Sequence, residues 1–133
     1  MQYVEAFNSF GYDVPNPRQD WSAEKPDGIC ITLWKAEVDW TPPPPRIDLW
    51  LKAEPGTTEW EALSGHKKRT LHLARAVSDF DGWIDVILVA GTPGEGYGSA
   101  DPWLPPQRAN HRWRVNKFEK ATGWFSAAAE KLE

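Results

Sequence analysis

Hydrophobic and polar residues alternate along several short stretches of the chain, and this period of two is typical of β-strands. The alternation is clearest at residues 29–35 and is repeated at residues 47–52. Residues 83–90 are almost continuously apolar, which predicts a central strand buried on both faces. Residues 111–118 and 124–127 predict two more strands, joined by a hairpin turn.

Apolar residues at helical spacing occur in two regions of the chain. Residues 2–10 predict a short amphipathic helix that is stopped by Gly11. A capping box at residues 58–61 begins a second helical pattern, which is interrupted near Gly65 and continues to about residue 80. The expected buried stripe of this main helix consists of Thr70, Leu73, Ala74 and Val77.

The order of these elements is helix, strand, strand, helix, strand, loop, strand, strand, which predicts an α+β fold. With 133 residues, the chain is expected to form one domain, residues 1–133. Within it we expect a curved, mostly antiparallel sheet of about five strands, packed by one main helix and a short N-terminal helix. At this strand count the sheet can also close partly into a barrel, an arrangement similar to that of PUA-like domains.

Three other segments are expected to lie outside the sheet and the main helices. Residues 41–45, a threonine and four prolines, fit a stiff spacer between strands or, alternatively, a ligand for an SH3 or WW domain. Residues 91–98 are glycine-rich but lack the lysine and the following helix of a phosphate-binding loop, so we expect a surface loop or lid. Residues 127–133 predict a weak helix or a fraying tail.

The composition includes nine tryptophans and one cysteine, Cys30. A lone cysteine cannot form an intramolecular disulfide, which fits a reducing compartment. No apolar run approaches the ~20 residues that a membrane-spanning helix needs, and the N-terminus has no signal-peptide pattern. We therefore expect a cytoplasmic protein with no membrane partner. Exposed tryptophan is common at binding surfaces, so some of the nine are candidate contacts.

The net charge of −4 is unevenly distributed along the chain. Residues 1–63 hold 5 Lys and Arg against 11 Asp and Glu, whereas residues 64–120 hold 9 against 6. The acidic first part argues against binding nucleic acid through charge alone, because such binding needs several phosphate contacts. The second part allows a local contact with phosphate, and its densest basic cluster is residues 66–69.

The chain lacks the residue patterns that are typical of metal centres and catalytic sites. Its three histidines are not spaced to put two ligands on one helix face, so we expect no metal and no cofactor. Glu37, Asp39 and Asp48 form the best group of carboxylates for a metal-dependent nuclease or hydrolase. The lysine spacing common in such nucleases is absent. We therefore expect a binding protein and not an enzyme.

The loop at residues 16–21 is the best candidate for a binding site. Prolines stiffen it, and its polar side chains lie beside a tryptophan that can stack on a nucleobase. The expected ligand-binding residues are Asn16, Arg18, Asp20, Trp21, Trp34 and Trp50. The expected phosphate-contacting residues are Lys67, Lys68, Arg69, Arg112 and Arg114.

The leading hypothesis is a small intracellular binding module that recognises nucleic acid or a nucleotide-like ligand through this aromatic and polar pocket. A single strand or a modified base would suit such a pocket. The alternative is a protein–protein interaction module, whose acidic, tryptophan-bearing surface binds a partner protein and imitates nucleic acid. The nuclease or hydrolase described above is the second alternative.

Overall fold

The computed structural model describes residues 2–15, 20–49, 64–92 and 96–132 of the chain. The α-helices in these ranges are α1 (Tyr3–Ser9) and α3 (Ser64–Asp79), and the 3-10 helices are η1 (Lys35–Glu37) and η3 (Pro105–Gln107). The strands are β1 (Ser22–Lys25), β2 (Gly28–Trp34), β3 (Arg46–Asp48), β4 (Trp83–Thr92), β5 (Gly96–Pro102), β6 (His111–Glu119) and β7 (Trp124–Lys131). No helix in the described ranges is long and apolar enough to cross a membrane.

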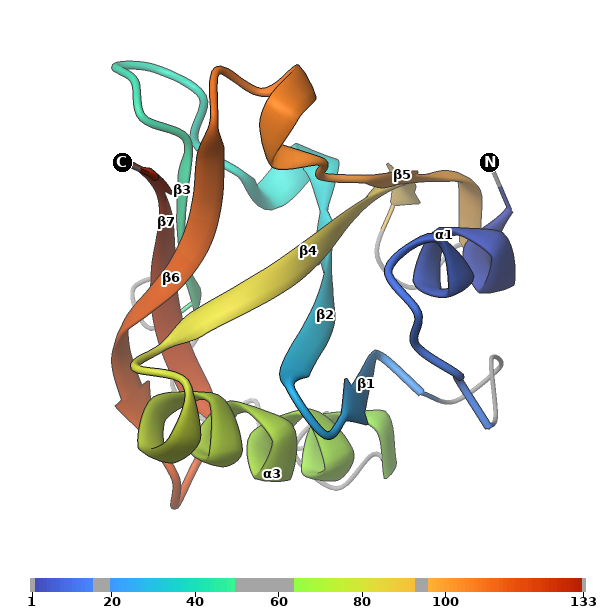
Figure 1. Ribbon diagram of the computed structural model, residues 1–133, viewed down its shortest axis with the longest axis vertical. Coiled ribbons are helices and arrows are strands. Elements are labelled where there is room, and N and C mark those ends of the chain that lie inside the picture. The colour runs from blue at the N-terminus through green and yellow to red at the C-terminus, as the bar shows by residue number, and fades with distance from the viewer. Residues whose placement is uncertain (1, 16–19, 50–63, 93–95, 133) are drawn as a thin grey trace.

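The strands form one sheet in the order β1-β2-β4-β6-β7-β3, and β5 also pairs with β4. The β2–β4 pair is parallel, and the other pairs are antiparallel. Figure 1 shows α3 lying along one end of the strands and α1 beside β5. The α+β fold is therefore confirmed.

The sheet differs in size and closure from the sheet that the sequence predicts. Within the described ranges it has seven strands and not about five, because β1 and β5 lack the alternating pattern that identified the other strands. The strand order ends at β1 on one side and at β3 on the other, so the sheet stays open. A PUA-like barrel is therefore not confirmed.

Two hydrophobic cores lie on opposite faces of β2. The larger core contains Ile29, Ile31 and Leu33 together with inward-facing residues of α3, β4, β6 and β7. Cys30 belongs to the second core, which packs α1 against the other face, and Trp34 packs against its edge. The predicted alternation of residues 29–35 is confirmed.

Helix α1 forms because its aromatic side chains recur at helical spacing and find a core to enter. Tyr3, Ala6 and Phe7 are buried, and the Tyr3 and Phe7 rings pack edge to face with centroids 5.2 Å apart. Burial of one such large side chain contributes roughly 1.5–3 kcal/mol. The predicted N-terminal helix is confirmed.

The buried stripe of α3 differs from the predicted one. Its buried residues are His66, Arg69, Leu73 and Ala76, and Phe80 packs against the same core after the helix ends. Val77, which was expected in the stripe, is 45% exposed. The prediction was right for Leu73, but Thr70 and Ala74 are only partly buried, and the helix buries a histidine and an arginine that the prediction left out. The predicted interruption near Gly65 is also wrong, because α3 runs from Ser64 through Gly65 without a break. The part of the predicted helix before Ser64 lies outside the described residues.

Two of the segments expected to lie outside the sheet belong to strands. Strand β7 continues to Lys131 because Ala127 and Ala129 are buried in the larger core and pair with β6. The expected helix or fraying tail at residues 127–133 is therefore wrong. Strand β4 continues to Thr92 and β5 begins at Gly96, so most of the predicted glycine loop is strand. Residues 93–95 lie outside the described residues.

The proline-rich segment, residues 41–45, joins η1 to β3 as a spacer within the domain. The backbone N–H of Asp39 donates to the carbonyl of Arg46 at 2.7 Å, and the Arg46 N–H donates back to Asp39 at 3.0 Å. A side-chain nitrogen of Arg46 also donates to the carbonyl of Pro42 at 2.8 Å. The segment is thus held at both ends by the fold that it connects.

Candidate functional site

Trp21 lies directly before β1 and faces the N-terminal turns of α3. Its ring packs edge to face on His66, with centroids 6.3 Å apart. The guanidinium of Arg69 lies over the same ring, 5.1 Å from its centroid. The side chain of Trp21 is only partly buried. The structure therefore brings the predicted tryptophan and part of the predicted basic cluster together.

Arg69 is the most deeply buried of the predicted phosphate-contacting residues, with 8% of its surface exposed. Its guanidinium also lies 5.3 Å from the centroid of the Phe125 ring, so two aromatic rings flank it. Its Nη2 atom contacts Nδ1 of His66 at 3.5 Å, the long limit of a hydrogen bond. Its Nε atom is sealed from solvent and has no acceptor among the described residues.

Burial lowers the pKa of Arg69 to about 10, and the carboxylate of Glu37 opposes this shift. The side chain therefore stays protonated at neutral pH. A buried cation is costly unless acceptors replace the lost water. Arg69 thus combines a positive charge, aromatic walls and an unused hydrogen-bond donor.

His66 is held in place beside Arg69 by a contact with the backbone. Its Nε2 atom lies 2.7 Å from the carbonyl oxygen of Thr122. A carbonyl oxygen only accepts, so Nε2 carries the hydrogen of this bond, and Nδ1 faces Arg69. Gly123 makes this approach possible, because a Cβ atom there would lie 2.6 Å from Nε2.

The two lysines of the predicted basic cluster, Lys67 and Lys68, have different surroundings from Arg69. Lys68 forms an ion pair of 2.9 Å with Asp20, whose side chain is 2% exposed. The backbone carbonyl of Asp20 also accepts a hydrogen bond from the hydroxyl of Tyr3. Asp20 thus acts as a buried counter-charge. Lys67 is exposed and makes no ion pair within the described ranges.

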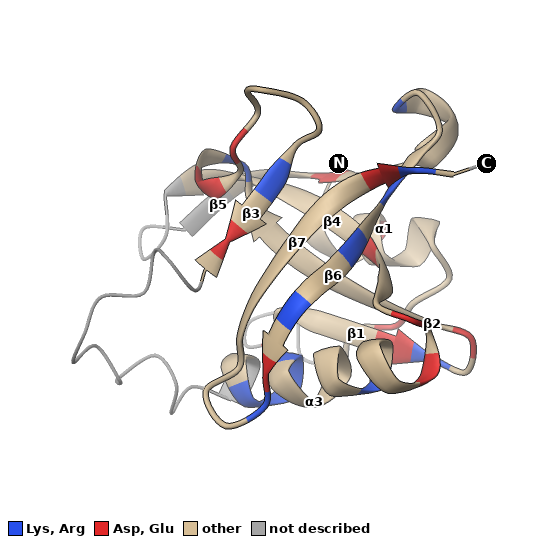
Figure 2. Cartoon of the chain, turned by 90° about the vertical axis from the view of Figure 1, so that its left-hand side faces the viewer, with Lys and Arg blue, Asp and Glu red and all other residues tan. Residues whose placement is uncertain are grey.

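Arg112 and Arg114 lie on a different face of the molecule. Their neighbour Trp113 is buried in the larger core, so alternation along β6 turns both arginines to the opposite face of the sheet. Arg112 pairs with Asp85 at 3.4 Å, and Arg114 pairs with Asp81. Figure 2 shows basic positions along β6 and in the first turns of α3. The predicted phosphate-contacting residues are therefore divided between two surfaces.

The predicted ligand-binding tryptophans are also divided. Trp34 packs beside the second core, on the α1 side of β2, whereas Trp21 faces α3. Trp50 lies outside the described residues, as do Asn16 and Arg18. The structure joins Asp20 and Trp21 to α3 but separates Trp34 from them.

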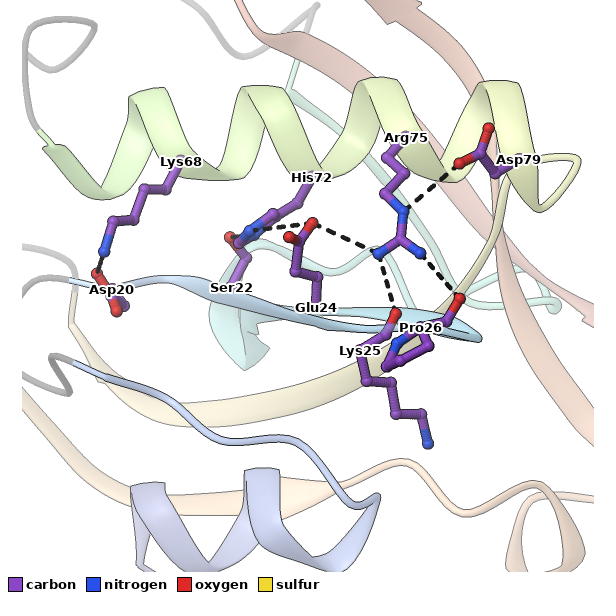
Figure 3. Close-up of polar contacts among 9 residues, drawn as sticks. All are labelled: Asp20, Ser22, Glu24, Lys25, Pro26, Lys68, His72, Arg75 and Asp79. Carbon is purple, nitrogen blue, oxygen red and sulfur yellow. Dashed lines mark hydrogen bonds and ion pairs between the residues drawn. The ribbon is translucent and has the colours of Figure 1, made fainter.

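A polar network ties β1 to α3, and Figure 3 shows its members. Ser22 Oγ and His72 Nδ1 are 2.6 Å apart, and His72 Nε2 lies 3.7 Å from a carboxylate oxygen of Glu24. Arg75 donates to the backbone carbonyls of Lys25 and Pro26 at 2.9 Å each.

The serine, histidine and glutamate of this network have the residue types of a hydrolytic triad. A serine nucleophile must be reachable by its substrate. Ser22 is 1% exposed, and the contact from His72 to Glu24 is longer than a hydrogen bond. The network therefore holds the helix to the strand.

The described residues contain no group of three or more His, Cys, Asp and Glu side chains placed to hold a metal ion. Glu37, Asp39 and Asp48 all lie in the described ranges, so these carboxylates do not form such a group. The geometry gives the nuclease hypothesis no support.

Comparison of the chain with protein-family models, with curated proteins and with solved structures finds no match.

Proposed function

We propose that this protein is a binding module for a small nucleotide-like ligand, held where Trp21 meets the N-terminal turns of α3. The contact between Trp21 and Arg69 carries the proposal. A partly exposed tryptophan supplies a face for a nucleobase, and an arginine supplies charge for a phosphate. Exposed Lys67 adds attraction at the rim.

The pairing of the surface cations favours a small ligand over a nucleic-acid strand. A strand must neutralise several phosphates with Lys and Arg side chains. Lys68, Arg112 and Arg114 are all paired with carboxylates of the protein itself. One nucleotide needs far fewer cations, so it fits the available charge better.

Titration with mononucleotides tests this function. Purified protein is titrated with AMP, GMP, CMP and UMP by isothermal calorimetry, and the same is done with Trp21→Leu. Loss of one base-stacking contact weakens binding by about 1–3 kcal/mol, so we expect a roughly 5- to 150-fold weaker affinity for the best nucleotide.

Trp34→Leu is the matched control, because Trp34 is also partly buried but lies on the other side of β2. It should leave the affinity unchanged. The proposal is wrong if none of the four nucleotides binds at millimolar concentration, or if Trp34→Leu weakens binding and Trp21→Leu does not. A single-stranded oligonucleotide that binds far more tightly than any mononucleotide, with a steep salt dependence, would restore the nucleic-acid hypothesis.

A further inference from the structure

Arg69 differs from three arginines on α3 and β6 that form ion pairs. Arg75, Arg112 and Arg114 each lie within 3.5 Å of a carboxylate oxygen. For Arg69 no carboxylate contact is present in the described part of the chain, and Glu37 influences it only through longer-range electrostatics. It is also the most buried of the four, at 8% exposure.

An unpaired buried cation is unusual, because removing its water without supplying acceptors destabilises the fold. Cation–π attraction to the two aromatic rings offsets part of this desolvation penalty. The rings do not accept conventional hydrogen bonds from the guanidinium N–H groups. His66 offers one long contact, and Nε has none within the described ranges. Nε is sealed from solvent, but the two outer nitrogens of the guanidinium are not both sealed and unbonded as Nε is. These outer nitrogens are therefore the donors that an acceptor from outside the protein can reach.

Guanidinium suits oxyanions, because its N–H groups form a planar fork that matches phosphate and carboxylate oxygens. The rings of Trp21 and Phe125 also restrict how the fork can turn. We propose that Arg69 is the receptor for a terminal phosphomonoester of the nucleotide ligand. This inference rests on the proposed function and specifies the ligand class for the same site.

The depth of Arg69 distinguishes a phosphomonoester from a phosphodiester. A phosphomonoester presents three free oxygens at the end of a molecule and carries up to two negative charges. An internal phosphodiester continues as chain on both sides, so it must pass along a surface. A side chain as covered as Arg69 is accessible to a terminal group far more readily than to a passing strand.

Calorimetry with three related probes tests this assignment. AMP carries a phosphomonoester, adenosine carries none, and the dinucleoside monophosphate ApA carries only a phosphodiester. Hydrogen bonds to a charged group predict that the native protein prefers AMP to both other probes by about 10- to 100-fold. Arg69→Met should lower the affinity for AMP to that for adenosine and leave adenosine binding unchanged.

Arg114→Met is the matched control, because Arg114 also lies 5.1 Å from a tryptophan centroid, that of Trp83. It should keep the full preference for AMP. Near-ultraviolet circular dichroism checks the fold of each variant. If Arg69→Met does not fold, Arg69→Lys takes its place. That variant keeps the charge but loses the fork, and we expect about a tenfold weaker affinity for AMP with adenosine binding intact.

The outcomes separate this inference from the function on which it rests. If AMP and adenosine bind the native protein equally, the nucleotide-binding function stands and the phosphate receptor is overturned. The same conclusion follows if Arg69→Met folds and keeps the AMP preference, because Arg69 is then only a packing residue. If a base other than adenine binds best, the three probes are made with that base. If none of the four mononucleotides binds, the proposed function itself fails.

Discussion

At the scale of single residues, side-chain type was a poor guide to burial. Arg69 and His66 are 8% and 2% exposed, although arginine is almost always at the surface. Arg69 tolerates burial because aromatic rings flank it, and His66 because Thr122 accepts its hydrogen. The two rings, Trp21 and Phe125, and the Thr122 carbonyl are all distant in sequence from α3, so no local pattern indicates these contacts.

Gly123 is a second residue whose role comes from a distant neighbour. Its φ is +78°, and a Cβ atom would lie 2.2 Å from Thr70 Oγ1 on α3. Gly123→Ala should therefore reduce the free energy of unfolding by about 2–4 kcal/mol, from backbone strain and overpacking together. Urea denaturation followed by tryptophan fluorescence measures this loss.

Gly98→Ala is the control, because a Cβ atom there meets nothing within 4 Å. It should change stability by no more than about 0.5 kcal/mol. Equal effects of the two substitutions would show that α3 does not press on the β6–β7 turn.

At the scale of elements, α3 shows how a correct helix can be predicted with a wrong buried face. The spacing of His66, Arg69, Leu73, Ala76 and Phe80 follows the helical period. Extending that period backwards from Phe80 and Leu73 would have found Arg69 and His66. The pattern was missed because the charged and titratable residues of the basic cluster were assigned to the surface.

Two leucines on α3 test which face is buried. Leu73 is 0% exposed and Leu71 is 63% exposed. Leu73→Ala should reduce the free energy of unfolding by about 2–5 kcal/mol, because it leaves a cavity in the larger core. Leu71→Ala should change it by less than about 0.5 kcal/mol. Chemical denaturation of both variants shows which helix face is buried. A larger loss of stability for Leu71→Ala than for Leu73→Ala would contradict the structure.

At the scale of the whole molecule, the parallel β2–β4 pair organises the sheet. Parallel neighbours need a long crossover connection, and the chain between β2 and β4 includes β3 and α3. This crossover places α3 at the end of the strands, where the network of Figure 3 ties it to β1. Global stability should therefore depend on that network.

The stability that this network provides should vary with pH, because His72 can take up a proton. Burial lowers the pKa of His72 below its usual value of 6.5, and the Glu24 carboxylate opposes the shift only in part. The folded protein then binds a proton more weakly than the unfolded chain. Its stability should be complete above about pH 6.5 and decrease as the pH falls through the lowered pKa.

Thermal unfolding between pH 7.5 and pH 5 measures this decrease. His72→Asn keeps a polar atom near Ser22 but cannot titrate, so its melting temperature should fall less over the same range. The groups that face His72 are Ser22, Glu24, Asp20, Lys68 and Arg75, and all are retained in the variant. Identical pH profiles for the two proteins would assign the dependence to other groups.

The sequence by itself determined the α+β class, helix α1, five of the strands and the β6–β7 hairpin, because local periodicity records which face of an element is apolar. It also placed Trp21 and the basic cluster among the candidates. Only the tertiary structure decided which cations are paired, which side of β2 each tryptophan occupies, and that Arg69 is buried. Those properties depend on contacts between residues far apart in the chain, and periodicity carries no information about such contacts.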